Sequence, residues 1–506
     1  MSYFQVDTLE RDVLQVLNLV GSARNTLAPI NKIPPDVLSL IPNYWEDHVR
    51  DKGLVRLTHV CRSWRELFTS CPLLWARLDC LNVNKTKTYI KRSKSSPLEI
   101  CLARLGHWTY PEEAIIQAAP HVGRLETIFA EGDSNKILTV LVKHFSCPGP
   151  PLKKLSIEHF SIYGHATLPN ELFNGDLSSL RELCLVGVVT PLPWRGLSNL
   201  TAFSLHRVPG DNILLTQLLD FFESTPHLHR ISLHDSIPNS SNAPAERLVF
   251  LHHLEDLSIV ARPAHSILLN HLSIPTGASL SLTFPLSGNE SHILSYLPKS
   301  LDNLNNLSHI VTINLCLGSR RCSARLNGPS GELYIHGDRA REDGRNSPMD
   351  LFLRSLDKFD ISRSQWLAVT RYNDWYQPTT HLVTHTLYQT LHSMEDLRIL
   401  TLTQCYNLPF ILTLNPAKSP DGIVLCPKLE EITFYIGRSD QPHFDELLSM
   451  AEERALRGAK LLGITVVSQE TLLQTEPLRL QKHVSHVEYK VDDAVPAWDA
   501  LPGTKE

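Results

Sequence analysis

The sequence predicts a mixed α/β protein in which a short helical segment precedes a long array of parallel strands. Two short segments with apolar faces lie close together near the start of the chain, and neither is long enough to bury its face alone. From about residue 97 onward, a six-residue phrase of the form apolar-x-x-apolar-x-apolar recurs. A chain of 506 residues is also too long for one compact core, so its length favours several domains or an elongated array.

The composition argues against several classes of function. The 48 Lys and Arg residues against 53 Asp and Glu give a formal charge of −5, whereas a protein that mainly binds a phosphate backbone is usually basic. Residues 1–10 lack the basic and then apolar pattern of a secretory leader, and no apolar run reaches the roughly 18 residues of a membrane span. The ten cysteines lie singly, without a CxxC pair, which favours reduced thiols. We therefore expect a cytoplasmic or nuclear protein that binds neither nucleic acid nor membrane.

The first predicted element is an amphipathic helix within residues 1–28. Asp7 and Glu10 stand three residues apart, as in a capping box, and an apolar series then recurs at helical spacing, comprising Leu9, Val13, Val16, Leu17 and Val20. Gly21 and the polar residues after it signal the end of the helix.

Two further short helices are predicted before residue 80. Pro34 and Pro35 open the first, which carries Val37, Leu38 and Ile41 on one side and ends at Pro42. The second has an apolar face formed by Leu57, Val60, Cys61, Trp64, Leu67 and Phe68. Both faces need a covering surface from elsewhere.

The motifs in this region resemble those of the F-box family. They are Ile33–Leu38, then Leu57–Arg65 with its Val-Cys-Arg-x-Trp-Arg core, then Pro72–Trp75, and the resemblance covers residues 29–78. Ile33 and Asp36 stand where the family usually has Leu and Glu. The resemblance implies a helical unit that docks into a groove of a Skp-family adaptor, and through it joins a cullin/RING ligase core. The positions it assigns to adaptor binding are Pro34, Val37, Leu38, Ile41, Leu57, Val60, Cys61, Trp64 and Trp75. The alternative is that these residues are only the core of an N-terminal helical cap.

The recurring phrase begins after a predicted linking helix at 79–96. Its clear copies are 152–157, 180–185, 200–205, 228–233 and 254–259, its later copies are 310–315, 356–361, 397–402, 429–434 and 461–466, and weaker ones are 98–102, 125–129 and 269–274. The phrase resembles the strand signature of leucine-rich repeats. The resemblance implies a solenoid over 97–470, with parallel strands on the concave side and helices or loops on the convex side.

Several details of the array are also predicted. The middle outward position of the phrase is small and hydroxylated in many copies, namely Ser156, Ser204, Ser232, Ser258, Thr401, Thr433 and Thr465. A convex-side helix is expected between Phe444 and Leu456, and a loop insertion near 327–350. Residues 471–506 are expected to form a cap and tail, with an edge strand through Val484, Val487 and Tyr489.

No motif for catalysis, cofactor binding or metal binding is present. The sequence lacks the nucleotide-binding, zinc-protease and serine-hydrolase signatures, and its only tight histidine groups are 227–229 and 252–253. The basic run between Lys85 and Lys94 is read as the solvated face of a helix, with a site for an acidic partner as the alternative. Side chains expected to face outward from the strands, and therefore candidates for binding a protein client, are Glu158, Arg230, His234, Asp256 and Tyr435.

Three functions compete on this basis. The first is a non-catalytic substrate receptor of a Skp/cullin/F-box ubiquitin ligase, which binds a protein client that the sequence does not identify. The second is an interaction scaffold built on the same array but without a ligase role. The third, a secreted polysaccharide-degrading β-helix, would require a signal peptide and clustered acidic side chains, and the sequence has neither.

Overall fold

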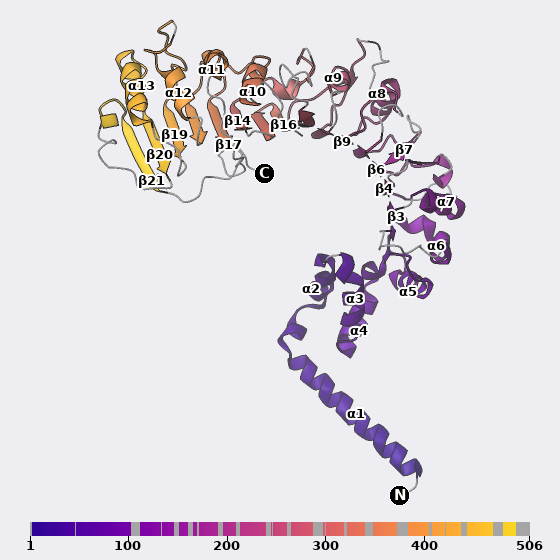
Figure 1. Cartoon of the computed structure of the whole chain (residues 1–506). Helices are drawn as coiled ribbons and strands as arrows, with labels where there is room; N and C mark the ends of the chain where they lie inside the picture. The colour runs from indigo at the N-terminus through magenta and orange to yellow at the C-terminus, as the bar shows by residue number, and fades with distance from the viewer. Residues whose placement is uncertain are drawn as a thin grey trace. The chain divides into compact units, whose positions relative to one another are not determined.

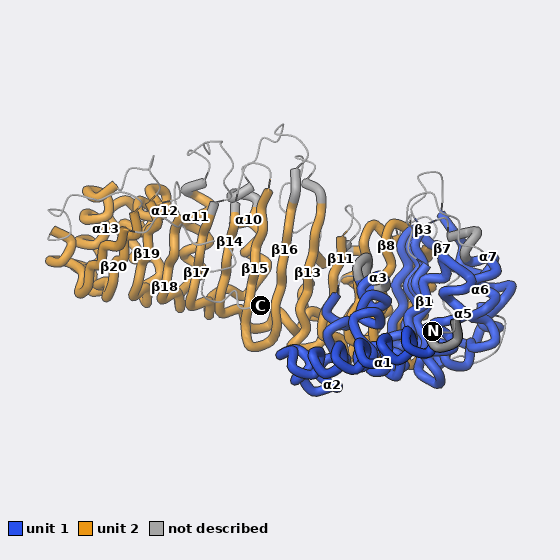
Figure 2. The backbone as a smooth tube through the Cα atoms, turned by 90° about the horizontal axis from the view of Figure 1, so that it is seen from below, with its two compact units in different colours: residues 1–191, 195–197 blue, residues 192–194, 198–506 orange. Residues whose placement is uncertain are grey.

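The computed structural model describes residues 3–45, 47–102, 112–132, 134–145, 151–159, 165–169, 172–190, 196–208, 213–238, 244, 246–260, 265–286, 297–298, 300–317, 321–339, 348–371, 383–403, 407–419, 421–436, 443–468 and 479–491. The chain divides into two compact units, which Figure 2 colours separately. Unit 1 comprises residues 1–191 with 195–197, and unit 2 comprises 192–194 with 198–506. The division therefore falls inside the predicted array, and not at the end of the helical segment near residue 78.

Unit 1 begins with the long helix α1 and a series of short helices, of which Figure 1 labels the α-helices. They are α1 (Tyr3–Leu27), η1 (Pro29–Lys32), α2 (Pro35–Leu40), η2 (Ile41–Tyr44), α3 (Asp47–Leu57), α4 (Arg62–Ser70) and η3 (Pro72–Trp75). A proline stands in the first turn of η1, α2, η2 and η3, where the missing backbone N–H has no partner to lose. The predicted helix within 1–28 and the short helix opened by Pro34 and Pro35 are thus confirmed as helices, although α1 continues past Gly21 to Leu27. The prediction of one helical face over Leu57–Phe68 was wrong, because α3 ends at Leu57, residues 58–60 form a turn, and α4 begins only at Arg62.

A parallel sheet follows directly on these helices within unit 1. Its strands are β1 (Arg77–Leu78), β2 (Leu98–Leu102), β3 (Leu125–Gly132), β4 (Lys154–His159) and β6 (Glu182–Val186), with each of the first four paired in parallel to the next. Its other elements are α5 (Val83–Ser93), α6 (Glu112–Ala118), η4 (Ala119–Arg124), α7 (Ser134–His144), η5 (Leu172–Gly175) and the short parallel pair β5 (Ala166–Thr167) and β7 (Val188–Val189). Because β1 pairs with β2, the helical segment is joined to the sheet by a strand.

Unit 2 holds a longer sheet, again mostly parallel. Its first three strands, β8 (Ala202–His206), β9 (Arg230–His234) and β11 (Asp256–Val260), pair in chain order and lead to β13 (Ser279–Leu286). Its last strands also pair in chain order, namely β17 (Trp366–Arg371), β18 (Ile399–Thr403), β19 (Glu431–Ile436), β20 (Gly463–Ser468) and β21 (His486–Val491).

Between these two runs, the order of strands in the sheet departs from the order in the chain. The intervening strands are β14 (Thr312–Leu317), β15 (Arg321–Gly328) and β16 (Gly331–Arg339), which form an antiparallel meander. β13 pairs with β16, and β17 pairs with β14, so the sheet order is β13-β16-β15-β14-β17. Among the described strands of this sheet, β15 alone runs antiparallel to its neighbours.

The connections of unit 2 are mainly helical. They include α8 (Leu215–Ser224), the short parallel pair β10 (Val249–Phe250) and β12 (Leu272–Ser273), α9 (His265–Leu269), η8 (Asn305–Leu307), α10 (Pro348–Leu356), α11 (Val383–His392), α12 (Asn407–Leu414) and α13 (Phe444–Leu456). Figure 1 shows α10 to α13 along one side of the strands. Gly458, just past α13, takes the left-handed conformation with φ of +81°, and the Ala459 N–H donates back to the Arg454 carbonyl oxygen, which ends the helix.

The core of each unit lies between its sheet and the helices. Alternate strand residues are buried on the helix side, as Ile231 and Leu233 of β9 illustrate, and the ring of Phe203 on β8 lies 4.7 Å from that of Phe221 on α8. The residues between them face the other side. There the predicted hydroxyl positions are neighbours on adjacent strands, in the runs Ser204–Ser232–Ser258 and Thr401–Thr433–Thr465.

Two predictions for unit 2 were wrong. The phrase at 356–361 is not a strand: it is the end of α10 and a turn, and the strand is β17, ten residues later. The loop predicted near 327–350 is replaced over 331–339 by β16, which turns back on β15 through Pro329 and Ser330. Residues 340–347 lie outside the described residues.

The C-terminal region is described in part. The predicted helix between Phe444 and Leu456 is confirmed as α13, and the predicted edge strand as β21, which pairs in parallel with β20. Residues 471–478 and 492–506 lie outside the described residues. Within the part of the chain that the structure describes, no helix is both long and apolar enough to cross a membrane.

Candidate functional site

The nine residues assigned to adaptor binding differ in exposure. Leu38, Trp64 and Trp75 are buried, with 4%, 7% and 0% of their surfaces exposed. Ile41, Leu57 and Cys61 are half-buried. Pro34, Val37 and Val60 are exposed. The motif therefore supplies both core and surface residues, and only the surface residues can meet another protein while this fold is kept.

The two motif tryptophans hold the helices together. The indole N–H of Trp75 donates a 2.8 Å hydrogen bond to the Phe68 carbonyl oxygen, and its ring meets that of Tyr89 edge-on at 5.0 Å. The indole N–H of Trp64 donates to the Asn31 side-chain oxygen at 2.5 Å, and its ring lies edge-on to Phe68 at 5.6 Å. Trp75 is thus a packing residue, because its side chain has no surface left for a partner.

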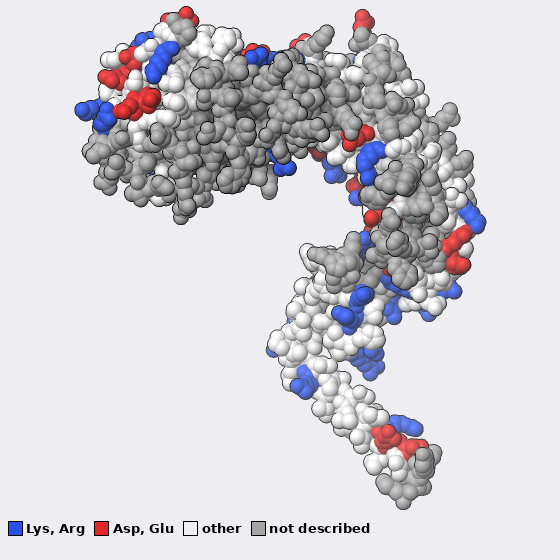
Figure 3. All heavy atoms as spheres, in the orientation of Figure 1, with Lys and Arg blue, Asp and Glu red and all other residues white. Residues whose placement is uncertain are grey.

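Helix α5 covers Trp75, and this accounts for part of the basic run. The guanidinium of Arg92 lies 4.2 Å from the Trp75 ring centre, and Lys85 pairs with Asp79 while lying over the Tyr89 ring. Lys87, Lys91 and Lys94 are exposed, and Figure 3 shows basic side chains on this face of the N-terminal helices. The predicted linking helix is therefore confirmed as a helix, but it packs tightly on the preceding segment.

The helical segment at 29–78 nevertheless keeps apolar side chains in solvent. Besides Val37 at 47% and Val60 at 58%, they include Leu40 at 50% and Leu73 at 68%. Val37 and Leu40 stand three residues apart on α2 and so share one side of that helix. Exposed apolar residues at motif positions are what a surface for docking in a groove requires.

A second candidate site lies on the sheet surface opposite the helices of unit 2. We call it the polar face, defined by Ser204 and His206 of β8, Arg230, Ser232 and His234 of β9, and Asp256 and Ser258 of β11. The parallel register puts His206 beside His234 and Arg230 beside Asp256. Side chains far apart in the sequence therefore form three rows: Ser204–Ser232–Ser258 across all three strands, His206–His234 across β8 and β9, and Arg230–Asp256 across β9 and β11.

The centre of the polar face is a serine between two histidines. The rings of His206 and His234 stack with centroids 4.1 Å apart and planes 7° from parallel. The Ser232 hydroxyl lies 3.2 Å from Nε2 of His206 and 3.3 Å from Nε2 of His234. One hydroxyl thus bridges both rings, and it fixes the orientation of each.

The strand ends position this pair of rings. Each histidine is followed by a residue in the left-handed conformation, Arg207 with φ of +55° and Asp235 with φ of +48°. The Arg207 N–H donates to the His234 carbonyl oxygen at 2.7 Å, and the Ser236 hydroxyl donates to the same oxygen at 2.8 Å. The Val208 N–H in turn donates to the Ser236 hydroxyl at 3.0 Å. Because the Arg207 and Val208 bonds join the turn after β8 to the turn after β9, the two side chains stay in register.

Burial gives this site unusual titration. It lowers the pKa of His206 to about 4, with the neighbouring His234 and Arg207 adding to the effect, and it also lowers the pKa of His234. Burial raises the pKa of Asp256 above its ordinary value, although Arg230 beside it acts in the opposite direction. At neutral pH the two imidazoles are uncharged, so they can both donate and accept hydrogen bonds.

The arrangement favours recognition over nucleophilic catalysis. A serine nucleophile needs a histidine held by a third group, together with donors for the developing oxyanion. Within the described ranges, no carboxylate is hydrogen-bonded to either imidazole, and Ser232 is shared between two rings instead of being aimed at one base. A hydroxyl, two neutral imidazoles and the Arg230–Asp256 row suit the polar groups of a bound peptide.

The structure brings together three of the five predicted client-binding residues. Arg230, His234 and Asp256 lie on the polar face, whereas Glu158 is on β4 of unit 1 and Tyr435 is on β19, near the far end of the unit 2 sheet. His206 and the bridging role of Ser232 were missed. His206 follows its phrase at the same offset as His234 does, and this repetition was the available signal.

The two tight histidine groups also meet in the structure. The His253 ring lies 5.9 Å from the rings of both His227 and His229. Among the described residues, no group of three or more His, Cys, Asp or Glu side chains is arranged to hold a metal ion.

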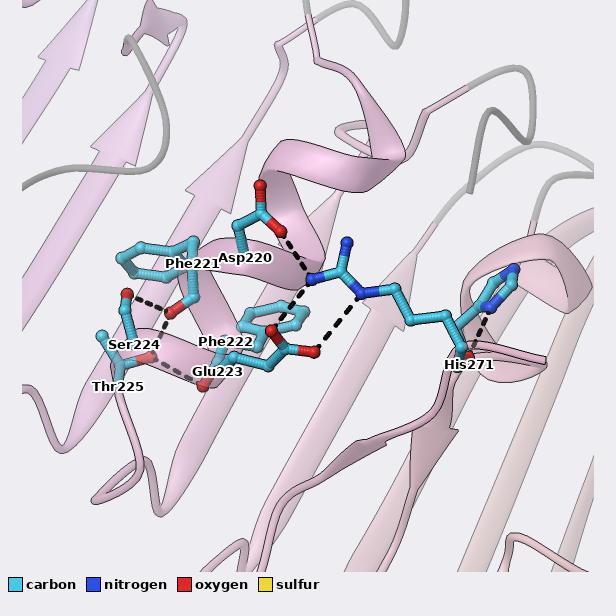
Figure 4. Close-up of polar contacts among 8 residues, drawn as sticks. Asp220, Phe221, Phe222, Glu223, Ser224, Thr225 and His271 are labelled. Atoms are coloured by element: carbon cyan, nitrogen blue, oxygen red, sulfur yellow. Dashed lines mark hydrogen bonds and ion pairs between the residues drawn. The ribbon is translucent and has the colours of Figure 1, made fainter. Parts of the chain in front are cut away.

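The ion-pair network around Arg247 has a structural role. Its guanidinium pairs with Asp220 at 2.5 Å and with Glu223 at 3.0 Å, two residues of α8 that Figure 4 shows. The Arg247 carbonyl oxygen lies 2.8 Å from Nδ1 of His271. The residue therefore ties α8 to the β10–β12 pair on the helix side of the sheet, away from the polar face.

The lowered histidine pKa values predict that acid weakens unit 2. In the unfolded chain, His206 binds a proton below its ordinary pKa of 6.5, whereas in the folded chain it stays neutral down to its lowered pKa of about 4. The free energy of unfolding therefore falls as the pH falls from 6.5 to about 4. Because the ring is only half-buried, we expect a loss of about 1–2 kcal/mol. Urea unfolding at pH 7 and at pH 4.5 measures this loss in the free energy of unfolding, which should be smaller for His206→Gln than for the wild type. The exposed His252→Gln should match the wild type, and an unchanged loss in His206→Gln would contradict the prediction.

A comparison with models of known protein families finds no match to this chain, and a comparison with curated proteins finds none either. The resemblance to the F-box family therefore rests on the three motifs at 33–38, 57–65 and 72–75.

Proposed function

We propose that this chain is the substrate-receptor subunit of a Skp/cullin/F-box ubiquitin ligase. The observation that carries the proposal is the pairing of motif and exposure in the helical segment at 29–78. Its buried motif residues, including Trp75, pack the helices, while Val37 and Val60 keep about half of their surfaces in solvent. Such a segment has both the rigidity and the apolar anchors that helix-in-groove docking uses.

The sheet supports the second half of the proposal, a leucine-rich-repeat-like solenoid that presents its strand side to a protein client. Strands of each unit pair in parallel in nearly continuous register, the apolar positions align under the helices, and the hydroxyl positions align on the other side. The β14–β16 meander departs from a simple one-strand repeat. The polar face on β8, β9 and β11 is the part of this surface best suited to a peptide.

On this proposal the chain is not the catalyst. The RING subunit and its conjugating enzyme would carry the chemistry, and this chain would hold the client close to them. No cofactor is needed for that role. The alternative is a scaffold with the same adaptor-binding segment but no ligase role, placed like the receptor in the cytoplasm or nucleus.

Adaptor binding is the decisive test. Val37→Asp and Val60→Asp, each in the full chain, are expected to weaken binding of a purified Skp-family adaptor at least about tenfold, because a charge replaces an apolar anchor. Both positions are exposed, so the melting temperature should not change. Val491→Asp, an equally exposed valine on β21, is the matched control and should bind the adaptor normally.

The outcomes separate the candidates. Isothermal titration that shows no adaptor binding by the wild type, or full binding by both aspartate variants, would remove the receptor proposal. Adaptor binding with no recruitment of a cullin, judged by co-elution in gel filtration, would favour the scaffold. Proximity labelling by the wild type and by Val37→Asp would then separate a client, which both should label, from the ligase core, which only the wild type should label.

A further inference from the structure

Helix α1 exposes an apolar surface along its whole described length. Every side chain from Val6 to Leu27 is exposed, and for the large apolar ones the exposed fraction runs from 47% at Val6 to 76% at Leu27. A helix of 25 residues is about 37 Å long. Isolated helices are marginal in water, so an apolar face of this length needs a cover.

The apolar residues follow a heptad repeat. Alternating steps of three and four residues define two positions of the heptad. Position a is occupied by Val6, Val13, Val20 and Leu27, and position d by Leu9, Val16 and Ala23. Such a seam of apolar residues, repeating every 3.5 residues on average, is the signature of a coiled coil. The repeat stops where η1 begins at Pro29, so the whole seam belongs to one helix.

The charges on α1 identify the covering helix. Its acidic residues, Asp7, Glu10 and Asp12, lie in the N-terminal half, which stays net negative although it also holds Arg11, and Arg24 lies near the C-terminal end. Figure 3 shows the middle of this helix without acidic or basic side chains. Two copies lying antiparallel would put each acidic end against the basic end of the other, and would also align their helix dipoles favourably.

The heptad register makes this complementarity specific. In an antiparallel pair each a residue faces a d residue of the second copy, and e positions face each other. When Val20 faces Val16 of the second copy, Glu10 stands opposite Arg24 at both ends of the pair. In the same register, Leu17 and Leu19 each stand opposite their own counterparts. The exposure of Leu17 at 61% and Leu19 at 65%, beside the seam, is thereby explained.

Other binding partners for the apolar face of α1 fit less well. A parallel pair would set Asp12 opposite Leu17, and Leu19 opposite Arg24, leaving charges against apolar side chains. An anionic membrane surface attracts helices with a polar face rich in Lys and Arg, whereas α1 carries three acidic and two basic residues. We propose that α1 pairs with α1 of a second copy of this chain as an antiparallel two-stranded coiled coil. The proposal does not depend on the receptor function.

Sedimentation equilibrium of the full chain over a concentration series tests the proposal. The wild type is expected to be a dimer, and Val16→Asp, in the seam, is expected to raise the dimer dissociation constant at least tenfold. Leu14→Asp makes a similar change at an exposed position outside the seam and should leave the dimer intact. Circular dichroism should show both variants folded, because α1 buries no side chain that the rest of unit 1 needs.

A charge exchange tests the direction of pairing. Glu10→Arg alone and Arg24→Glu alone should each weaken the dimer, and the two together should restore it, because each copy again offers opposite charges at both ends. A monomeric wild type, a dimer that survives Val16→Asp, or a double exchange that fails to restore pairing would each overturn the proposal. Monomers that instead bind anionic vesicles through α1 would do the same.

Discussion

Replacing Trp75 with alanine is expected to lower the free energy of unfolding of unit 1 by about 4–5 kcal/mol. The side chain is wholly buried, and α4, α5 and η3 all contribute to its environment. Truncation would leave a cavity under Tyr89, remove the surface on which the Arg92 guanidinium lies, and leave the Phe68 carbonyl oxygen without the indole donor. No smaller side chain at this position can restore all three contacts.

Two other variants separate the contributions. Trp75→Phe keeps an aromatic ring but loses the indole N–H, so it should cost roughly half as much. Leu73→Ala, two residues earlier and 68% exposed, should change stability by less than about 0.5 kcal/mol. Urea unfolding measures the change in the free energy of unfolding for each variant, and hydrogen exchange at β1 and β2 shows where in unit 1 the stability is lost. Equal stability of Trp75→Ala and Leu73→Ala would show that the tryptophan is not a core residue.

The same variants bear on adaptor binding. Trp75→Ala should abolish adaptor binding by unfolding the segment that presents the surface, whereas Val37→Asp should weaken it without loss of structure. Replacing Leu38 or Trp64, which are also buried, should likewise abolish adaptor binding through loss of structure. Exposed positions are therefore the informative ones for mapping the interface.

Replacing Arg454 with alanine is expected to cost unit 2 about 3–5 kcal/mol. This α13 side chain has no exposed surface, and its guanidinium donates to the carbonyl oxygens of Leu425 and Cys426 at 2.7 and 2.9 Å. Cys426 has a φ of +46°, so the arginine supports a strained turn between α12 and β19. Its removal would leave the buried Leu425 carbonyl oxygen without a donor, leave the Cys426 carbonyl oxygen with only the Leu429 N–H at 3.0 Å, and open a cavity along the helix.

Arg454→Met isolates the hydrogen bonds. Methionine fills much of the space of the arginine stem, so its cost should come mainly from the two lost guanidinium hydrogen bonds, of which only the one to Leu425 leaves its carbonyl oxygen without a donor, and amount to about 2–3 kcal/mol. Arg479→Ala is the matched control. Arg479 is exposed, and its side chain forms an ion pair at 3.2 Å with Asp445, which lies on α13 as Arg454 does. Denaturant unfolding that shows Arg454→Ala as stable as Arg479→Ala would contradict a structural role for the buried guanidinium.

The sequence predicted most strands of the sheet because their apolar phrases repeat a simple rule. In β4, β6, β8, β9, β11, β18, β19 and β20, the first apolar residue precedes the strand and the next two point under the helices. The same rule explains the failure at β17. Ser364 occupies the first position there and donates to the Ile310 carbonyl oxygen, so the apolar phrase is broken, and the buried residues Phe359 and Ile361 imitate it a few residues too early.

The meander was missed for a different reason. Its strands carry a period-two pattern, with Cys322, Ala324 and Leu326 buried and the residues between them polar. The cluster of glycine and proline at 328–331 was read as part of a long loop, although it is only a tight turn between paired strands. Gly328 is needed at that turn, since a Cβ there would clash with the His309 carbonyl oxygen.

The candidate site on the sheet was predictable only in part. The strand register identifies which residues face outward, and so gave Arg230, His234 and Asp256. The stacking of His206 on His234 depends on the exact offset between neighbouring strands, which the loops between them set. In the helical segment, the motifs could not separate Trp75, which packs inside, from Val60, which is exposed.

The order of strands around the meander also constrains how unit 2 can assemble. β13 finds its partner in β16, more than fifty residues further along the chain, whereas β9 and β11 are about half as far apart. During synthesis, the edge of β13 therefore waits unpaired while β14 and β15 emerge, and growth of the sheet cannot proceed by adding each new strand to the last. The meander is the point at which this unit must close a long loop, and the point at which an incompletely made chain is most exposed to aggregation.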